Sequence, residues 1–521
     1  MYLAGIDVGT TNTKAIIFDV EAGKVLSVGT CRTITQHPTV EWSQYEADDL
    51  WSSVVQSLRQ AIAQCDRPER IRGISVASMG EAGLPLDAEG NVLHPAIAWH
   101  DRRTTTQAQW WEDTFGVKQV YVITGQVLHP MFGINKLLWL RSHAPMVFQR
   151  IDRWLSIEDF VLWKLSGTIA TDYSIASRTM VFDQRTLTWS ETLLKHAGIP
   201  VEWFPPAFPA GTPIGTVLKD IAEVTGLPQH TEVVTGGHDH LCGALAAGVI
   251  RPGQLLDSTG TASAIFALSP TFQPSDELFA SGFTSYAYVK RATYVTLGSL
   301  NFAGGALEWL VHLLYGQDSQ STMSGETFAQ ILGEVANVPR GSRGAVILPY
   351  FLGSGTPSRQ ESALAAMLGL APSHGRKELL RALMEGLSFW LRDNLEALYK
   401  HGIVLPYPEI IAIGGVTKAT ELMQIKAEVT GCRIRVPHIS EAAATGAALL
   451  AGVGVGAFRS SEEAAAALHH TETTYEPADE ARATYDDIYH KIYLPARHSV
   501  LGTKDATEGA TIDERRGSAQ T

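Results

Sequence analysis

Apolar and polar positions at the start of the chain follow the pattern of a β-hairpin. Residues 2–6 are apolar, residues 7–14 form a turn rich in Gly and Thr, and residues 15–18 are apolar again. Short apolar runs bounded by turn residues predict buried strands. A similar pattern recurs at residues 254–268, with its turn at 257–263. We therefore expect two hairpins about half a chain apart and a distant internal duplication.

The stretches between and after these hairpins alternate between strand and helix patterns. Residues 71–77 are an apolar run, and residues 48–63 have the period of a helix. The segment 376–400 is long and amphipathic, and the segment 419–430 ends before Gly431, a residue typical of helix C-termini. This alternation predicts an α/β fold in which helices cover sheets.

Chain length predicts more than one domain. A chain of 521 residues is too long for a single core, and two domains of roughly 200–250 residues would create a cleft between them. We place the first domain at residues 1–250 and the second at 251–480. Residues 496–521 are polar and small, so we expect a disordered tail there.

Composition narrows the possible partners. Hydrophobic residues make up 45% of the chain, and the formal net charge is -13, which disfavours binding to nucleic acid or to anionic membranes. No apolar run is long enough to span a bilayer, and the N-terminus lacks a signal-peptide pattern, so we expect a cytoplasmic protein. The four cysteines, Cys31, Cys65, Cys242 and Cys432, are widely spaced and are expected to be reduced thiols.

The first hairpin tip carries groups suited to holding phosphates. Gly9 permits a sharp turn, Thr10 and Thr11 offer hydroxyls, and Lys14 supplies a cation. Asp7 ends the first strand facing the tip, where its carboxylate could hold the water shell of a Mg²⁺ ion. The alternative is an ordinary hairpin whose Thr residues bond their own backbone.

Two further Gly-containing turns are candidates for nucleotide contacts. Gly260 and Thr261 lie at the second hairpin tip and could complete a phosphate clamp, although both residue types are common in ordinary turns. Gly414 and Gly415 follow the apolar strand 410–413 and offer a flat surface for an adenine ring. A simple strand–turn–helix joint is the alternative there.

The most informative segment surrounds Asp239. An apolar strand leads into a Gly pair, then Asp239, then a helix of small residues, so Asp239 lies at a strand-to-helix junction where ligands approach the backbone. His238 and His240 also suggest a metal site, a weak hypothesis because a third ligand is missing. In a strand, both imidazoles would share one face and Asp239 would point to the other.

Common catalytic motifs are missing, but a family resemblance is extensive. The sequence contains no GxSxG, GxxxxGK[ST] or GxGxxG motif. From about residue 3 to about residue 455 it resembles the FGGY carbohydrate kinases, which include glycerol kinases, xylulokinases and ribulokinases. The matching fragments, in family order, are GIDVGTT (5–11), WHDRR (99–103), KLLWL (136–140), DYS (172–174), TMVFD (179–183), GGHD (236–239), GT (260–261), MEG (384–386), GG (414–415), Glu441 and GAA (446–448).

This resemblance implies a fold, a reaction and a set of roles. The fold would be α/β, with two RNase H-like domains of the actin/hexokinase ATPase type flanking a central cleft. The reaction would be ATP-dependent, Mg²⁺-requiring phosphorylation of a hydroxyl of a small sugar, ketose or polyol. Asp239 would be the general base and Asp7 would organise Mg²⁺; the implied nucleotide contacts are Thr11, Lys14, Gly260 and Thr261 at the phosphates and Gly414 with Gly415 at the adenine.

The resemblance gives substrate positions without fixing the substrate. By analogy, Glu81, Trp99, Asp101 and His240 would contact it. Glu81 lies in the segment 78–83, where xylulokinases carry Met-His-Gly and glycerol kinases carry Gln-Arg-Glu-Thr, so the sugar pocket matches neither group. Ketoses, polyols and deoxy-sugars stay open, as does an acidic sugar if nearby Arg side chains turn inward.

Two further departures concern the second domain. The stretch 353–357 lacks the Glu-Arg pair often found before Thr-Pro, which questions any salt bridge that orders this loop. Ala419 stands where a polar adenine contact is frequent.

Two other functions compete with the kinase. A non-catalytic sugar or nucleotide sensor would keep the cleft without needing a base at Asp239. An actin-like ATPase would use the fold to act on a protein partner, which Glu81 and the segment 99–103 argue against. The resemblance also allows a homodimer.

Overall fold

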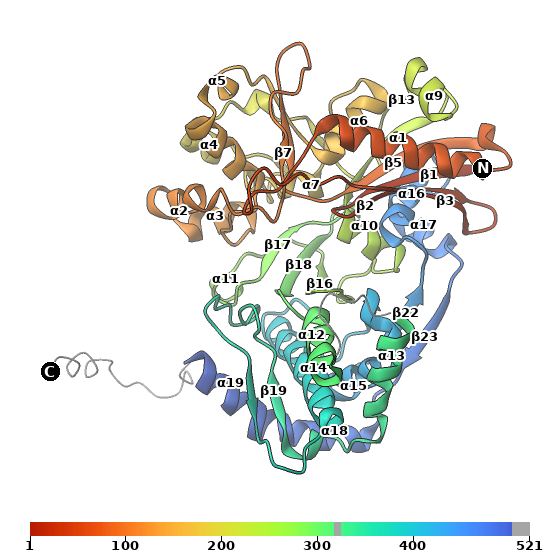
Figure 1. Cartoon of the computed structure of the whole chain (residues 1–521). Coiled ribbons are helices and arrows are strands. Elements are labelled where there is room, and N and C mark those ends of the chain that lie inside the picture. The colour runs from red at the N-terminus through yellow and green to blue at the C-terminus, as the bar shows by residue number, and fades with distance from the viewer. Residues whose placement is uncertain (317–324, 503–521) are drawn as a thin grey trace.

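A computed structural model describes residues 1–316 and 325–502 and shows two α/β units, each built on one large sheet (Figure 1). The first sheet has the strand order β13 (Pro213–Thr216), β14 (Glu232–His238), β5 (Ile71–Ser78), β1 (Tyr2–Val8), β2 (Asn12–Asp19) and β3 (Lys24–Arg32). The second has the order β17 (Thr284–Ala287), β18 (Tyr294–Leu300), β16 (Ser263–Ser269), β15 (Leu255–Thr259), β21 (Ile410–Ile413), β22 (Ile434–His438) and β23 (Thr471–Tyr475).

The two sheets repeat one topology. In the first, the antiparallel strands β1, β2 and β3 are followed by β5 and β14, which run parallel to β1. In the second, the antiparallel strands β15, β16 and β18 are followed by β21 and β22, which run parallel to β15. This repetition confirms both predicted hairpins and the predicted two-domain α/β class.

Helices with an apolar face cover the outer side of each sheet. On the first sheet these include α1 (Ala47–Ala63) and α6 (Ile157–Ser166), which share one hydrophobic core with it. On the second they include α14 (Arg376–Lys400) and α15 (Thr420–Thr430). The helix α15 ends at Gly431, which adopts the left-handed conformation with φ of 67°. The helices expected at 48–63, 376–400 and 419–430 are therefore present.

Two helices of small residues lie between the sheets. The helix α10 (Asp239–Ala246) packs against α16 (Ala442–Gly454), and both share a core with the inner faces of the two sheets. Glycines allow this close packing: a Cβ on Gly5 of β1 would lie 1.9 Å from the carbonyl oxygen of Ala444, and one on Gly446 would lie 1.9 Å from that of Cys242. The segment that carries α16 therefore returns to the first sheet.

The first residues of the expected C-terminal tail are helical, which corrects the prediction for them. Residues at the start of the expected tail, 496–501, belong to the helix α19 (Leu494–Leu501), and Leu501 is buried. Arg497 Nε lies 3.3 Å from Oδ2 of buried Asp393, on α14. A single Leu and Arg in a polar stretch gave no periodic signal, although they dock the helix. Residues 503–521 lie outside the described part of the chain.

The state of the cysteines agrees with the reduced thiols expected from the sequence, and the length and apolar character of the helices bear on membrane crossing. All four cysteines are free thiols. Among the helices of the described residues, none combines the length and the apolar character needed to cross a membrane.

We expect Arg497→Met to lower the free energy of unfolding by about 2–3 kcal/mol, because the Asp393 carboxylate stays buried while it loses a cationic partner. Urea denaturation followed by Trp fluorescence measures the change. Lys491→Met is the matched control, since its ion pair with Asp487 is solvent-exposed and worth little. Equal stability of the two variants would show that the Arg497 contact does not hold α19 in place.

Candidate active site

The first hairpin places the carboxylate of Asp7 and the amine of Lys14 at the rim of a groove. Asp7 on β1 is directly opposite Lys14 on β2, so both side chains leave the same face of the sheet. Lys14 Nζ donates a 2.6 Å hydrogen bond to Oε2 of Glu441, the residue that precedes α16 and has a φ of 49°. The lysine thus connects the hairpin to the helix layer.

Asp7 has the properties of a cation ligand. Its Oδ1 atom is buried and has no hydrogen-bond partner among the described residues. Burial and the charge of Asp239, opposed by Lys14, raise the pKa of Asp7 to about 8. Mg²⁺ is typically bound by one or two carboxylates together with substrate phosphates, so this oxygen fits Mg²⁺ or its water shell. Within the described ranges, no cluster of three or more His, Cys, Asp or Glu side chains could hold a metal alone.

The groove beside Asp7 has a volume of about 920 Å³ and runs between the two domains. Its lining includes Gly9, Lys14, Asp239, Gly414 and Gly415. The predicted glycines of the adenine surface and the predicted phosphate lysine therefore share one groove with both carboxylates.

Four predicted nucleotide residues are not among the groove-lining residues of this structure: Thr10, which lines a neighbouring cavity, Thr11, Gly260 and Thr261. Gly260 and Thr261 form the exposed tip of the β15–β16 hairpin and are not among the groove-lining residues, and neither is the exposed Thr11. The carbonyl oxygen of Gly260 instead accepts a 3.0 Å bond from the backbone nitrogen of Gly304. Ser258, on the strand before this tip, does line the groove.

Asp239 is the first residue of α10, at the strand-to-helix junction that the sequence predicted. It lines the groove and also a second, smaller cavity. Burial raises the pKa of Asp239, and the charge of Glu81 adds to this effect, while His240 and Arg178 oppose it. A carboxylate with a raised pKa at the meeting point of two cavities is suited to accept a proton.

The second cavity, of about 310 Å³, is lined by both domains. From the first domain come Glu81, Trp99 and His240, three of the four predicted substrate residues, together with Thr10. Trp99 Nε1 donates a 3.0 Å hydrogen bond to Oγ1 of Thr10, so the indole rests on the hairpin tip. The second domain supplies further lining residues from β16, β18 and the loops between 282 and 359.

Glu81 is held rigidly in this cavity. It has a φ of 65°, which is uncommon for a residue with a side chain, and its Oε1 accepts a 2.6 Å bond from Nε of Arg178. Lys136 Nζ donates to the carbonyl oxygens of Glu81 and Met131 at 2.7 and 2.8 Å. Arg178 therefore compensates the negative charge of Glu81, which is predicted to contact the substrate.

Asp101, the fourth predicted substrate residue, is not among the lining residues of this cavity. Its buried carboxylate accepts hydrogen bonds from Arg103 Nε and Nη2 and from the backbone nitrogen of Ser43 at 2.7–3.0 Å. The guanidinium and Ser43 occupy both oxygens, so in this structure Asp101 orders its loop and does not face the cavity. The family resemblance pointed to Asp101 but did not reveal that its partner is Arg103, two residues later.

The geometry around His238 and His240 corrects one sequence argument. The rings lie 5.4 Å apart, but Asp239 does not point to the opposite side, because the chain turns into α10 at that residue. All three side chains line the second cavity. Burial lowers the pKa of His238 far below its ordinary range, which keeps this imidazole neutral.

Buried carboxyls support the strand that leads to Asp239. Glu158 Oε1 accepts a 2.7 Å bond from the backbone nitrogen of Gly236. Asp172 Oδ1 accepts from Ser174 Oγ at 3.0 Å, and that hydroxyl in turn accepts a 2.9 Å bond from the nitrogen of His238. These contacts fix the last residues of β14. No sequence pattern pointed to Glu158.

Arg178, Arg359 and His129 also line the second cavity and were not singled out from the sequence. Arg178 is adjacent to the matched segment 179–183, which was the nearest available signal. Its partner Glu81 lies 97 residues away, and such long-range ion pairs leave no periodic pattern.

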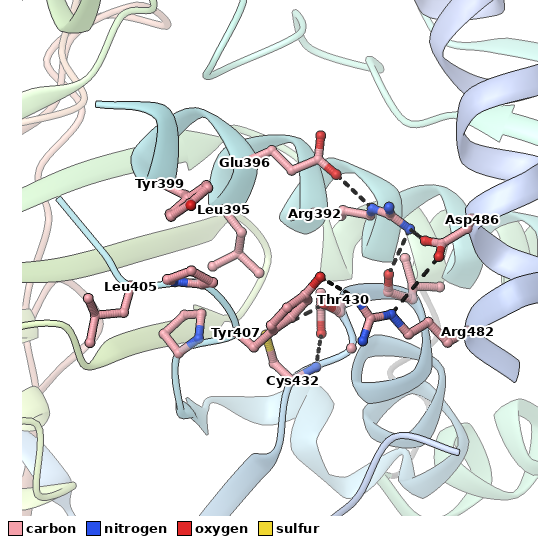
Figure 2. Close-up of a pocket in the computed structure, with 14 residues that line it drawn as sticks. Arg392, Leu395, Glu396, Tyr399, Leu405, Tyr407, Thr430, Cys432, Arg482 and Asp486 are labelled. Carbon is pink, nitrogen blue, oxygen red and sulfur yellow. Dashed lines mark hydrogen bonds and ion pairs between the residues drawn. The ribbon is translucent and has the colours of Figure 1, made fainter. Parts of the chain in front are cut away.

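A third cavity, of about 120 Å³, lies beside the C-terminal half of α14, and its charged lining residues are paired with one another within the described part of the chain (Figure 2). Arg392 bonds Glu396 and Asp486 at 2.9 and 2.7 Å, and Arg482 donates to the Tyr407 hydroxyl. Burial raises the pKa of the lining thiol, Cys432, to about 11. With its charges paired and its thiol protonated, this cavity offers no reactive group.

Two duplicated α/β domains around a cleft lined by carboxylates define an ATP-dependent phosphotransferase of the actin/hexokinase type. Residues 2–246 match the N-terminal domain of the FGGY family of carbohydrate kinases, and residues 255–455 match its C-terminal domain. The chain belongs to this family, and its activity is the ATP-dependent phosphorylation of a sugar or polyol hydroxyl.

Individual relatives span nearly the whole chain. A xylulose kinase from Bacillus subtilis (strain 168) is 29% identical over 500 residues, which cover 94% of this chain and 96% of the relative. The structure of a xylulose kinase from Rhodospirillum rubrum matches with a TM-score of 0.87 at 28% identity, covering 96% of this chain and 99% of the other. A gluconate kinase from Lactobacillus acidophilus matches with a TM-score of 0.87 at 25% identity, covering 96% and 98%.

We expect Glu158→Gln to gain stability relative to the natural protein as pH rises from 5 to 8. Burial raises the pKa of Glu158 well above 4.5, and the charges of Asp172 and Asp159 add to the rise. The folded state therefore binds more protons than the unfolded chain above pH 4.5, so the natural protein loses stability as pH rises toward the raised pKa. Gln keeps the acceptor for Gly236 and does not titrate.

The measurement is the free energy of unfolding of both proteins at each pH. The gap is expected to change by at most about 1.4 kcal/mol per pH unit. The control Glu361→Gln removes an exposed carboxyl and should follow the natural profile. Parallel profiles for Glu158→Gln and the natural protein would contradict the predicted titration.

Proposed function

We propose that this carbohydrate kinase uses Asp239 as the general base, with the nucleotide in the groove and the acceptor sugar in the second cavity. One observation carries the proposal: Asp239 and the adjacent His240 line both spaces. A sugar hydroxyl in the smaller cavity would meet the terminal phosphate of a nucleotide in the groove at this carboxylate. Fold analogy alone would not single out the residue, and its position between the two spaces supports this choice.

The transfer needs one proton acceptor and a well-ordered pair of substrates. The acceptor oxygen forms a bond to the γ-phosphorus as the bond from that phosphorus to the β–γ bridging oxygen breaks and ADP leaves. The hydroxyl proton passes to the Asp239 carboxylate. Burial has already raised the pKa of this group, which brings its basicity closer to the working pH.

The groove residues have distinct tasks in this proposal. Gly414 and Gly415 present a surface without side chains toward the adenine, and Lys14 holds a positive charge at the phosphates. Asp7 would hold Mg²⁺ through its unpaired Oδ1, directly or through water. Bound Mg²⁺ neutralises phosphate charge and fixes the phosphate geometry.

The acceptor class is a small polyhydroxylated compound. Relatives of known structure include a xylulose kinase and a gluconate kinase, so the same fold serves a ketose and a sugar acid. The relatives do not favour a sensor or an actin-like ATPase. A homodimer and a cytoplasmic location stay predictions from the sequence.

We expect Asp239→Asn to lower kcat by about 10²- to 10⁴-fold, because the hydroxyl proton then has no acceptor. Coupled ADP release with Mg-ATP and a panel of ketoses, polyols and sugar acids measures the loss. Asp276→Asn removes an exposed carboxyl that pairs with Lys118 and should retain full activity. Ordinary turnover by a folded Asp239→Asn variant would show that another group takes the proton.

Asp7→Asn is expected to raise the Mg²⁺ concentration needed for half-maximal activity by about 10- to 100-fold, by analogy with the loss of groups that orient metal ligands. An amide keeps the size of the side chain and removes its charge. Activity titrated with Mg²⁺ at fixed ATP gives the value. An unchanged titration curve would place the ion away from Asp7.

A further inference from the structure

We propose that the acceptor substrate is a sugar acid whose carboxylate is held by Arg359, with His129 as a second hydrogen-bond donor. The inference rests on the proposed function, since it places the acceptor in the cavity that contains Asp239. It concerns specificity only: the carboxylate is bound and takes no part in phosphoryl transfer.

The charges that face this cavity are unevenly compensated. Glu81 and Arg178 neutralise each other through a buried ion pair. Arg359 has no such partner: among the described residues its guanidinium has only a 3.6 Å ion pair with Glu361, whose side chain is 69% exposed. An exposed pair at that distance contributes little. The cavity therefore presents one cation that is not neutralised, and a guanidinium matches a carboxylate in shape and charge.

His129 adds a neutral donor beside this cation. Its Nδ1 accepts a 3.2 Å hydrogen bond from the backbone nitrogen of Met131, which assigns the ring proton to Nε2. Burial, together with the charges of Arg359, Arg102, Arg178 and Lys136, lowers the pKa of His129 to about 4, so the ring is neutral. The uncompensated guanidinium of Arg359 therefore lies near a neutral imidazole that can donate from Nε2, an arrangement suited to an anionic ligand.

The structure holds Arg359 in place. Gly282, which also lines the cavity, leaves room for its stem: a Cβ there would lie 2.9 Å from Cβ and 3.4 Å from Cδ of Arg359. The preceding loop is fixed to α14, because the Thr356 carbonyl oxygen accepts bonds from Trp390 Nε1 and Asn394 Nδ2 at 2.7 and 3.1 Å. These bonds order the loop without the Glu-Arg pair that the sequence lacks.

A carboxylate suits the cavity better than a phosphate group. The cavity already contains the carboxyls of Glu81 and Asp239, so a dianion would meet more repulsion than a monoanion. A single uncompensated guanidinium matches a single negative charge. The polyhydroxylated remainder of the acid supplies the hydroxyl that reaches Asp239.

The test compares aldonates with the alditols of the same carbon skeleton, such as gluconate with glucitol and xylonate with xylitol. Xylulose and a sugar phosphate complete the panel. Binding is measured by calorimetry in the presence of a non-hydrolysable ATP analogue, and turnover by ADP release. The proteins are the natural chain, Arg359→Gln, Asp239→Asn and the control Arg72→Gln, which removes an exposed guanidinium from the first sheet.

We expect at least one aldonate to bind and react at least 10-fold better than its alditol. Arg359→Gln should raise the KM for that aldonate by about 10- to 100-fold, as expected for loss of a charge-assisted hydrogen bond, and should change kcat less. For the neutral compounds, KM and kcat should be the same in Arg359→Gln as in Arg72→Gln.

Other outcomes separate the two proposals. Preference for xylulose or an alditol, unaffected by Arg359→Gln, overturns the sugar-acid inference and leaves the kinase proposal intact. Preference for the sugar phosphate, or failure of every aldonate to bind, also overturns the inference. Aldonate binding that depends on Arg359, with turnover unaffected by Asp239→Asn, supports the inference and contradicts the proposed base.

Discussion

The cleft depends on how closely α10 can lie against α16. A Cβ on Gly446 would collide with the carbonyl oxygen of Cys242, and a Cβ on Gly5 would collide with that of Ala444. Only glycine permits both contacts, so the helix layer between the two sheets is thin. Asp239 begins α10, so this packing also sets the position of the carboxylate opposite the hairpin that carries Asp7. Backbone contacts one layer away thus determine the geometry of the site.

The same arrangement carries an electrostatic cost. Asp7 and Asp239 are half-buried near each other, and desolvation raises the pKa of both. A structural site would surround such groups with donors, yet Asp7 Oδ1 has none among the described residues. Unpaired buried polar atoms of this kind are uncommon and tend to mark functional sites. The stability of the surrounding fold offsets this electrostatic cost. A bound cation with its nucleotide would supply the compensating positive charge and make the arrangement favourable.

Local patterns explain most of what could be predicted from the sequence. The hairpins, α14 and the strand-to-helix junction at Asp239 depend on short-range periodicity and turn residues, and each is present. Contacts between distant segments were beyond such patterns: Lys14 with Glu441, Glu81 with Arg178, and Glu158 with Gly236. Asp101 shows the converse, since family resemblance located it near the substrate and a local pair with Arg103 turned its carboxylate away. Thr11, Gly260 and Thr261 lie on exposed hairpin tips and do not line the groove.

Sharing of the second cavity between the domains has a consequence for control of the reaction. Its first-domain wall includes Glu81, His129 and Asp239, and its second-domain wall includes Gly282 and Arg359. A ligand that contacts both walls favours the arrangement in which the walls are close, because its binding energy is greatest there. Closure of that kind excludes water from the terminal phosphate and so favours transfer to the sugar over hydrolysis of ATP. Recognition of the substrate by a second-domain residue therefore links specificity to the assembly of the catalytic site.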